Sequence, residues 1–187
     1  FQASEVPIVH KSIGIFQGLY VCGDVDYIFG PNTAFFDHCE IHSIARVSEG
    51  KAYITAASTP AGQEFGLVFS HCRITGEEPD SVYLGRPWRD CAKTAFICCE
   101  LGDHICPEGW QNWGKVRAEV LSDYIEYGNF GPGADCSGRS PLSRCLVNPE
   151  VETYFSKENV LVGEDGWIPA ENLPPDLLPF SLQLSDS

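Results

Sequence analysis

A six-residue pattern recurs three times in this chain and limits its possible folds more than any other feature. It reads FDHCEI at 36–41, FSHCRI at 69–74 and FICCEL at 96–101. Each copy has Phe first, Cys fourth and an aliphatic residue sixth. Cys39 and Cys72 are 33 residues apart, and Cys72 and Cys99 are 27 apart. Internal repeats with periods of roughly 20 to 50 residues are typical of solenoid proteins.

The composition of the repeats favours strands over helices. The segments are short, aromatic and β-branched, and Gly, Pro and Asn lie between them. Such segments are typical of β-strands. Unequal intervals fit coils whose loops vary in length while their strands stack. We therefore predict an all-β parallel β-helix with Cys39, Cys72 and Cys99 stacked inside successive coils. An antiparallel sandwich is the alternative.

The chain has 187 residues and is interpreted as one domain spanning 1–187, with a divergent, incomplete part at 1–19. The segment 128–144 is rich in Gly, Ser and Pro and predicts a long surface loop. A short helix is expected within 147–161. The proline-rich tail at 171–187 is expected to wrap around the domain or fray.

Net charge and cysteine usage exclude several kinds of partner. The formal charge of −14 argues against nucleic acid and against an anionic membrane surface. No apolar run approaches the roughly 20 residues of a membrane span. The nine cysteines contain no CxxC pair, and most are expected to be buried thiols. His38 and His42, and likewise His71-Cys72, could suggest a metal pair, but on strands that end in turns they need not converge. We expect no metal site.

Two acids stand within the apolar stretch GDVDYIFG at 23–30. On a regular strand Asp24, Asp26 and Ile28 would share one face. A partly buried carboxylate needs a partner. The best candidate is Arg86 in YLGRPW, because its guanidinium can hold a carboxylate in one orientation. The 60 residues between Asp26 and Arg86 correspond to about two coils, which would place both on one face.

Five segments in order resemble the signatures of pectin methylesterases: GDVDYIFG (23–30), YLGRPW (83–88), GWQNW (109–113), EYGNFGPGA (126–134) and GWIP (166–169). The resemblance covers roughly residues 20 to 170. It implies a right-handed parallel β-helix with long loops and a short C-terminal helix and tail. The implied reaction is the metal-free, cofactor-free hydrolysis of methyl esters on homogalacturonan.

The resemblance also implies roles for individual residues. Asp26 corresponds to the nucleophile and Arg86 to the residue that orients it. Trp88 and Trp110 correspond to substrate-facing aromatics, although either Trp110 or Trp113 could line the cleft while the other packs beneath it. Tyr27, next to the nucleophile, could border the sugar subsite.

One departure from the family pattern bears on activity. The family places its general acid in a Gln-Asp-Thr-Leu-Tyr motif about twenty residues before the nucleophile. Counting back that far from Asp26 reaches Glu5, which has no matching context. Gln17, Leu19 and Tyr20 resemble a shortened remnant of the motif, with Gly18 in place of the acid and Gln17 as a possible oxyanion donor. We therefore expect the chain to be weakly active or inactive.

Two other functions stay open from the sequence. One is a Ca²⁺-dependent polysaccharide lyase that uses an arginine base, and the other is a non-catalytic pectin-binding remnant. For the esterase, the expected partner is methyl-esterified pectin. The expected state is a monomer, with association through an exposed coil end as the alternative. The resemblance implies a secreted, extracellular location.

Overall fold

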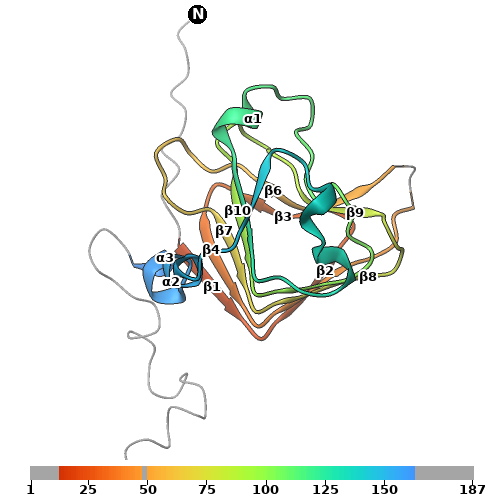
Figure 1. Cartoon of the computed structure of the whole chain (residues 1–187), viewed down its shortest axis with the longest axis horizontal. Coiled ribbons are helices and arrows are strands. Elements are labelled where there is room, and N and C mark those ends of the chain that lie inside the picture. Colours follow the sequence, from red (N-terminus) through yellow and green to blue (C-terminus); the bar gives the residue numbers. More distant parts are fainter. Residues whose placement is uncertain (1–12, 48–49, 163–187) are drawn as a thin grey trace, which may run out of the picture.

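The computed structural model describes residues 13–47 and 50–162, and its strands coil around a common core (Figure 1). Residues 1–12, the GWIP segment and the tail at 171–187 lie outside the described residues.

All strand pairs are parallel and form three sheets. The six-stranded sheet has the order β1 (Ile13–Gln17), β4 (Thr33–Asp37), β7 (Leu67–Ser70), β10 (Lys93–Ile97), β12 (Asp123–Tyr127) and β13 (Ser143–Leu146). The four-stranded sheet has the order β11 (Glu100–Leu101), β8 (Arg73–Gly76), β5 (Glu40–Ser43) and β2 (Tyr20–Gly23). The three-stranded sheet has the order β3 (Val25–Gly30), β6 (Ala52–Ala57) and β9 (Val82–Gly85). This arrangement confirms the predicted parallel β-helix.

The repeated pattern builds the interior. The rings of Phe16, Phe36, Phe69 and Phe96 stack in sequence, with centroids 4.8, 4.6 and 4.5 Å apart. Each repeat cysteine donates its thiol to the phenylalanine carbonyl of the preceding coil, over 3.3 to 3.5 Å. Cys39, Cys72 and Cys99 are all buried, as expected from their place in the repeat.

The first coil corrects one interpretation of the sequence. Phe16 is in register with Phe36, and Tyr20 with Glu40. Gly18 has φ of 63°, and His38, at the equivalent corner, has φ of 50°. The segment 16–21 is therefore one more copy of the repeat, with Leu19 in the cysteine position. It forms an ordinary coil corner, and the interpretation as a shortened Gln-Asp-Thr-Leu-Tyr remnant was wrong.

Short helices and one disulfide cover the outside of the coils. The α-helices are α1 (Ala118–Leu121), α2 (Glu150–Tyr154) and α3 (Lys157–Leu161), and the 3₁₀ turns are η1 (Pro132–Ala134) and η2 (Cys136–Gly138). Where one short helix was expected within 147–161, there are two, and they pack against the six-stranded sheet through Val151, Val160 and Leu161 (Figure 1). Cys136 and Cys145 form a disulfide, and the other seven cysteines are free thiols. None of the described helices is long and apolar enough to cross a membrane.

Candidate active site

A β-bulge in β3 places Asp26 on the outer surface. Val25 pairs with Tyr53 and Ile28 pairs with Thr55, so β3 has one residue more than β6 between these two points. An extra residue of this kind bends the strand and redirects a side chain. Asp26 has φ of 52°, which is uncommon for a non-glycine residue. Regular alternation therefore fails: Ile28 is buried in the core, whereas Asp26 does not share its face.

Asp26 and Arg86 meet as their spacing predicted. Arg86 Nε donates to Asp26 Oδ1 over 3.0 Å, and Arg86 Nη2 donates to Oδ2. The two side chains are only 14% and 16% exposed, so solvent screens the pair less than it would an exposed one. Two parallel N–H···O bonds fix the orientation of the carboxylate as well as its position. The geometry holds an ionised carboxylate in one place at the surface of the three-stranded sheet.

Two aromatic rings hold the Arg86 guanidinium. Its Cζ lies 4.0 Å from the Tyr53 ring centroid and 4.6 Å from that of Trp113. Arginine stacks on aromatic faces because its planar cation is attracted to the π-electron density. The backbone N–H of Arg86 also donates to the Thr55 carbonyl over 3.0 Å. The arginine therefore has little freedom to move away from Asp26.

A pair of tryptophans lies beside the ion pair. The Trp88 and Trp113 rings stack with centroids 5.3 Å apart, and the two residues are 44% and 41% exposed. Lys115 Nζ lies 4.7 Å from the Trp113 ring centroid and donates to the carbonyls of Pro87 and Trp88. Exposed, rigidly held aromatic faces are suited to stacking against the apolar face of a sugar ring.

Trp110 was predicted to face substrate, but the structure places it in the core. It is 1% exposed and stacks on Tyr124 with ring centroids 4.2 Å apart. Its Nε1 donates to Glu126 Oε1 over 2.8 Å. A Cβ on Gly85 would lie 2.1 Å from Thr55 Oγ1 and 3.1 Å from Trp110, so only glycine fits there. Of the two tryptophans, Trp113 is therefore the one on the surface, and Trp110 is the one that packs in the core.

Tyr27 also points inward rather than toward a sugar subsite. It packs against the core, and its hydroxyl lies 2.9 Å from Ser43 Oγ. Burial raises the pKa of this phenol well above its ordinary value. A Cβ on Gly23 would lie 2.4 Å from Tyr27 Cβ, so the neighbouring strand is fitted to the inward ring. The predicted substrate contact of Tyr27 does not agree with this position.

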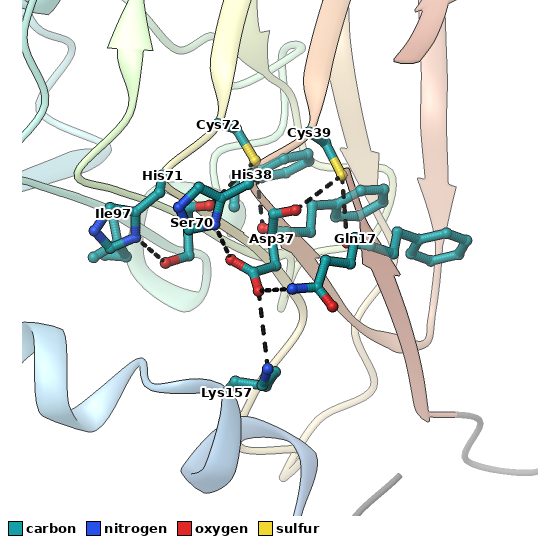
Figure 2. A network of polar contacts seen from close by, with 12 residues as sticks. Gln17, Asp37, His38, Cys39, Ser70, His71, Cys72, Ile97 and Lys157 are labelled. Atoms are coloured by element: carbon teal, nitrogen blue, oxygen red, sulfur yellow. Dashed lines mark hydrogen bonds and ion pairs between the residues drawn. The ribbon is translucent and has the colours of Figure 1, made fainter. Parts of the chain in front are cut away.

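Gln17 lies at a different corner of the coil from Asp26. It ends β1, and its Nε2 donates to Asp37 Oδ2 over 3.1 Å (Figure 2). Asp37 also contacts His38 and Lys157 there (Figure 2). The amide that was predicted as an oxyanion donor is therefore used in a polar cluster on the corner between the six- and four-stranded sheets. Asp24 is exposed and accepts a hydrogen bond from the Val25 N–H over 2.8 Å.

Tyr53 and Lys115 were not among the predicted site residues, and Trp113 was considered only as the alternative to Trp110. A signal for Tyr53 was present in the repeat, because it follows Asp26 by 27 residues, the interval that separates Cys72 from Cys99. Nothing comparable marks Lys115, which reaches the site from an irregular loop. Two groups of potential metal-ligand atoms occur in the described residues, and neither includes Asp26 or Arg86.

Comparisons with known proteins place this geometry in a family. The family model for pectinesterases matches residues 7–164. Pectinesterase 31 of Arabidopsis thaliana is 37% identical over 144 residues, which are 76% of this chain and 44% of that protein. The chain therefore spans less than half the length of this relative.

Solved structures agree with the sequence comparison. The pectin methylesterase from carrot superposes with a TM-score of 0.76 at 29% identity, over 89% of this chain and 55% of that one. A pectin methylesterase in complex with a hexasaccharide gives a TM-score of 0.68 at 27% identity, over 87% of this chain and 53% of that one. The family model matches most of the chain, and these structures share its fold. The chain therefore belongs to the pectinesterase family.

Proposed function

We propose that this chain carries the nucleophilic half of an ester hydrolase site that removes methyl groups from esterified homogalacturonan. The observation that carries the proposal is the Asp26 carboxylate, held on a bulge by an arginine whose guanidinium lies against two aromatic rings. Family membership and the likeness to a pectin methylesterase bound to a hexasaccharide support the substrate class.

The chemistry follows from the arrangement. An Asp26 oxygen attacks the carbonyl carbon of the methyl ester. The tetrahedral intermediate then expels the methoxy group, which takes a proton from water and leaves as methanol, and an acyl-enzyme anhydride remains. Water then hydrolyses the anhydride and restores the Asp26 carboxylate. Arg86 keeps the carboxylate aimed, so the attack does not first require reorientation. Trp88 and Trp113 offer the faces against which neighbouring sugar rings can stack.

The metal-free esterase is distinguished from the rival functions by its products. The esterase makes methanol from methylated pectin, and a chelator does not stop it. A Ca²⁺-dependent lyase makes a product that absorbs in the near ultraviolet and stops when a chelator is added. A non-catalytic binder retains pectin and makes neither product. Methanol formation by the wild-type chain that is lost in Asp26→Asn supports the proposal, and either of the other two outcomes overturns it.

The remaining functional statements follow from the same proposal. Methyl-esterified pectin is the expected partner, and the wall in which pectin lies is extracellular, so we propose an extracellular location. The missing Gln-Asp-Thr-Leu-Tyr motif led to the expectation of a weakly active or inactive chain; of these two outcomes the proposal takes weak activity, which stays a prediction, as does the monomeric state.

A further inference from the structure

We propose that His71, Cys98 and Glu152 form a binding site for a zinc-type divalent cation, separate from the Asp26–Arg86 pair. The candidate ligand atoms are a histidine nitrogen, a cysteine sulfur and a carboxylate oxygen, and all lie within 4.8 Å of one another. His71 Nε2 and Glu152 Oε1 are 4.0 Å apart. This set of donors is one that zinc uses in proteins, and it does not suit Ca²⁺ or Mg²⁺, which prefer oxygen alone.

The coiled fold brings the first two ligands together. Each turn from the six-stranded to the four-stranded sheet has a residue in the left-handed conformation, and His71 and Cys98 hold this position in successive coils, both with φ of 53°. The strands that precede them are in register, with Ser70 opposite Ile97. The two side chains therefore project from one ridge at the corner of the β-helix.

The third ligand comes from a separate element. Glu152 lies in α2, which packs against the six-stranded sheet through Val151. At the next coil the ridge position is Gly128, whose absent Cβ would lie 3.0 Å from Cys98 Sγ. No side chain from that position therefore covers the sulfur, and Cys98 is only partly buried.

The distances allow one ion to bind all three ligands after small side-chain rotations. Two ligands, each about 2.0 to 2.3 Å from a tetrahedral zinc ion, lie about 3.3 to 3.7 Å from each other. His71 and Glu152 are exposed, so their side chains are free to close the remaining gap. With three protein ligands, the fourth position of the ion would be open to water.

A partner outside the ligand set orients His71 for this role. Its Nδ1 lies 2.9 Å from Ser70 Oγ (Figure 2). In the tautomer in which Nδ1 donates to Ser70, the Nε2 lone pair is available to a metal. The His38 ring stacks on the His71 ring, with centroids 5.2 Å apart, which further fixes the His71 ring plane (Figure 2).

The second group of potential ligands in the described residues does not offer the same chemistry. It consists of Glu126, Cys136 and Cys145. The two sulfurs form a disulfide, and the Glu126 carboxylate is already held by Arg139. The expectation from sequence was that His71-Cys72 would bind no metal. The structure agrees that Cys72 points inward, and it offers Cys98 of the next coil in its place.

Titration of the purified chain with Zn²⁺, followed by calorimetry, tests the site. We expect one ion per chain, and a rise in melting temperature on binding. Co²⁺ in place of Zn²⁺ should give a thiolate-to-metal charge-transfer band. His71→Ala, Cys98→Ser and Glu152→Gln should each weaken binding by tenfold or more. Ser70→Ala should weaken it about 10- to 100-fold while leaving every ligand in place.

Cys22→Ser is the matched control, because Cys22 is an exposed free thiol at another position. This variant should bind like the wild-type chain and keep the charge-transfer band. Since Glu152 is exposed, Glu152→Gln is expected to fold normally, and circular dichroism checks this for every variant. Absence of a bound ion in the wild-type chain would overturn the proposal. Equal affinity of the wild-type chain and His71→Ala or Glu152→Gln would also overturn it, because the thiol would then act alone.

Discussion

The Arg86 guanidinium donates to both carboxylate oxygens of Asp26, although 60 residues separate them in the chain. Two turns of the β-helix bring these residues close together in space, because β3, β6 and β9 lie side by side in one sheet. β6, between them, contributes Tyr53, whose ring lies 4.0 Å from the guanidinium carbon. Three successive coils thus supply the candidate nucleophile Asp26, the ring of Tyr53 and the arginine that binds the carboxylate, Arg86.

Arg86→Lys is expected to lower kcat about 10²-fold, because a lysine cannot donate the two parallel hydrogen bonds that aim the carboxylate. The substitution keeps the positive charge, so the loss would report orientation rather than charge. Methanol release from methylated pectin at saturating substrate measures it. Arg89→Lys, at an exposed arginine three residues away, is the matched control and should be near wild type. An unchanged kcat in Arg86→Lys would contradict the proposed role.

Trp113→Ala and Trp88→Ala are expected to differ in their kinetics. Both remove a face of the stacked pair, and a lost aromatic contact of about 1 kcal/mol would raise KM about fivefold. Only Trp113 also covers Arg86, so Trp113→Ala should lower kcat as well, whereas Trp88→Ala should leave kcat nearly unchanged. Val116→Ala, at an exposed apolar residue close to Trp113 in sequence, controls for general disturbance of this segment. The same kcat for the two tryptophan variants would refute this division of roles.

Arg139→Met is expected to destabilise the fold by about 3 to 5 kcal/mol, because it leaves the Glu126 carboxylate buried without its cation. The two side chains are only 4% and 2% exposed, and Arg139 donates through Nε and Nη2 to both Glu126 oxygens. Urea unfolding measures the loss.

Two further variants make this test specific. Adding Glu126→Gln to Arg139→Met should recover part of the lost stability, because a neutral amide still accepts from Trp110 Nε1. Arg144→Met breaks an exposed pair with Asp123 and should cost less than about 1 kcal/mol. A similar loss of unfolding free energy in Arg139→Met and Arg144→Met would mean that burial does not determine how much an ion pair contributes to stability.

His104 is expected to make stability depend on pH. The ring is 1% exposed, neither nitrogen has a hydrogen-bond partner among the described residues, and burial lowers its pKa to about 4. Asp103 opposes this shift and His42 adds to it. Between the folded pKa and the ordinary value of 6.5, the unfolded chain binds more protons, so stability is full above 6.5 and falls as pH falls toward 4.

The expected loss from His104 across this window is about 3 kcal/mol. Denaturant unfolding of the wild-type chain and His104→Leu at several pH values measures it, and the variant should have a shallower slope. His38→Gln removes an exposed histidine and should keep the His104 contribution. Identical slopes for the wild-type chain and His104→Leu would show that His104 does not carry the effect.

The repeat made the fold and one contact of the site predictable. Stacked coils follow from the spacing of Cys39, Cys72 and Cys99, and the meeting of Asp26 with Arg86 follows from the same period. The errors lie where local geometry departs from the regular pattern. A bulge at Asp26 cancels strict alternation, so Tyr27 turned inward, against the prediction. The single extra residue of such a bulge cannot be recognised from the amino-acid composition of the strand.

The assignment of the tryptophans required three-dimensional packing. Trp110 and Trp113 are three residues apart and have the same side chain, and the packing of Trp110 against Gly85, Tyr124 and Glu126 is visible only in three dimensions. Gln17 was assigned from a resemblance to a short motif, whereas its register with Asp37 shows that it belongs to the first described coil. Core packing decided the first of these outcomes and register between coils decided the second.

The most direct test of the central claim is methanol release from methylated pectin by the wild-type chain, Asp26→Asn and Asp24→Asn in parallel. Asp24 is the matched control, because it is an acid two residues away that bonds only to the local backbone. The account predicts that the wild-type chain and Asp24→Asn release methanol at similar low rates and that Asp26→Asn releases none above background. No release by the wild-type chain, or equal release by the wild-type chain and Asp26→Asn, would contradict it.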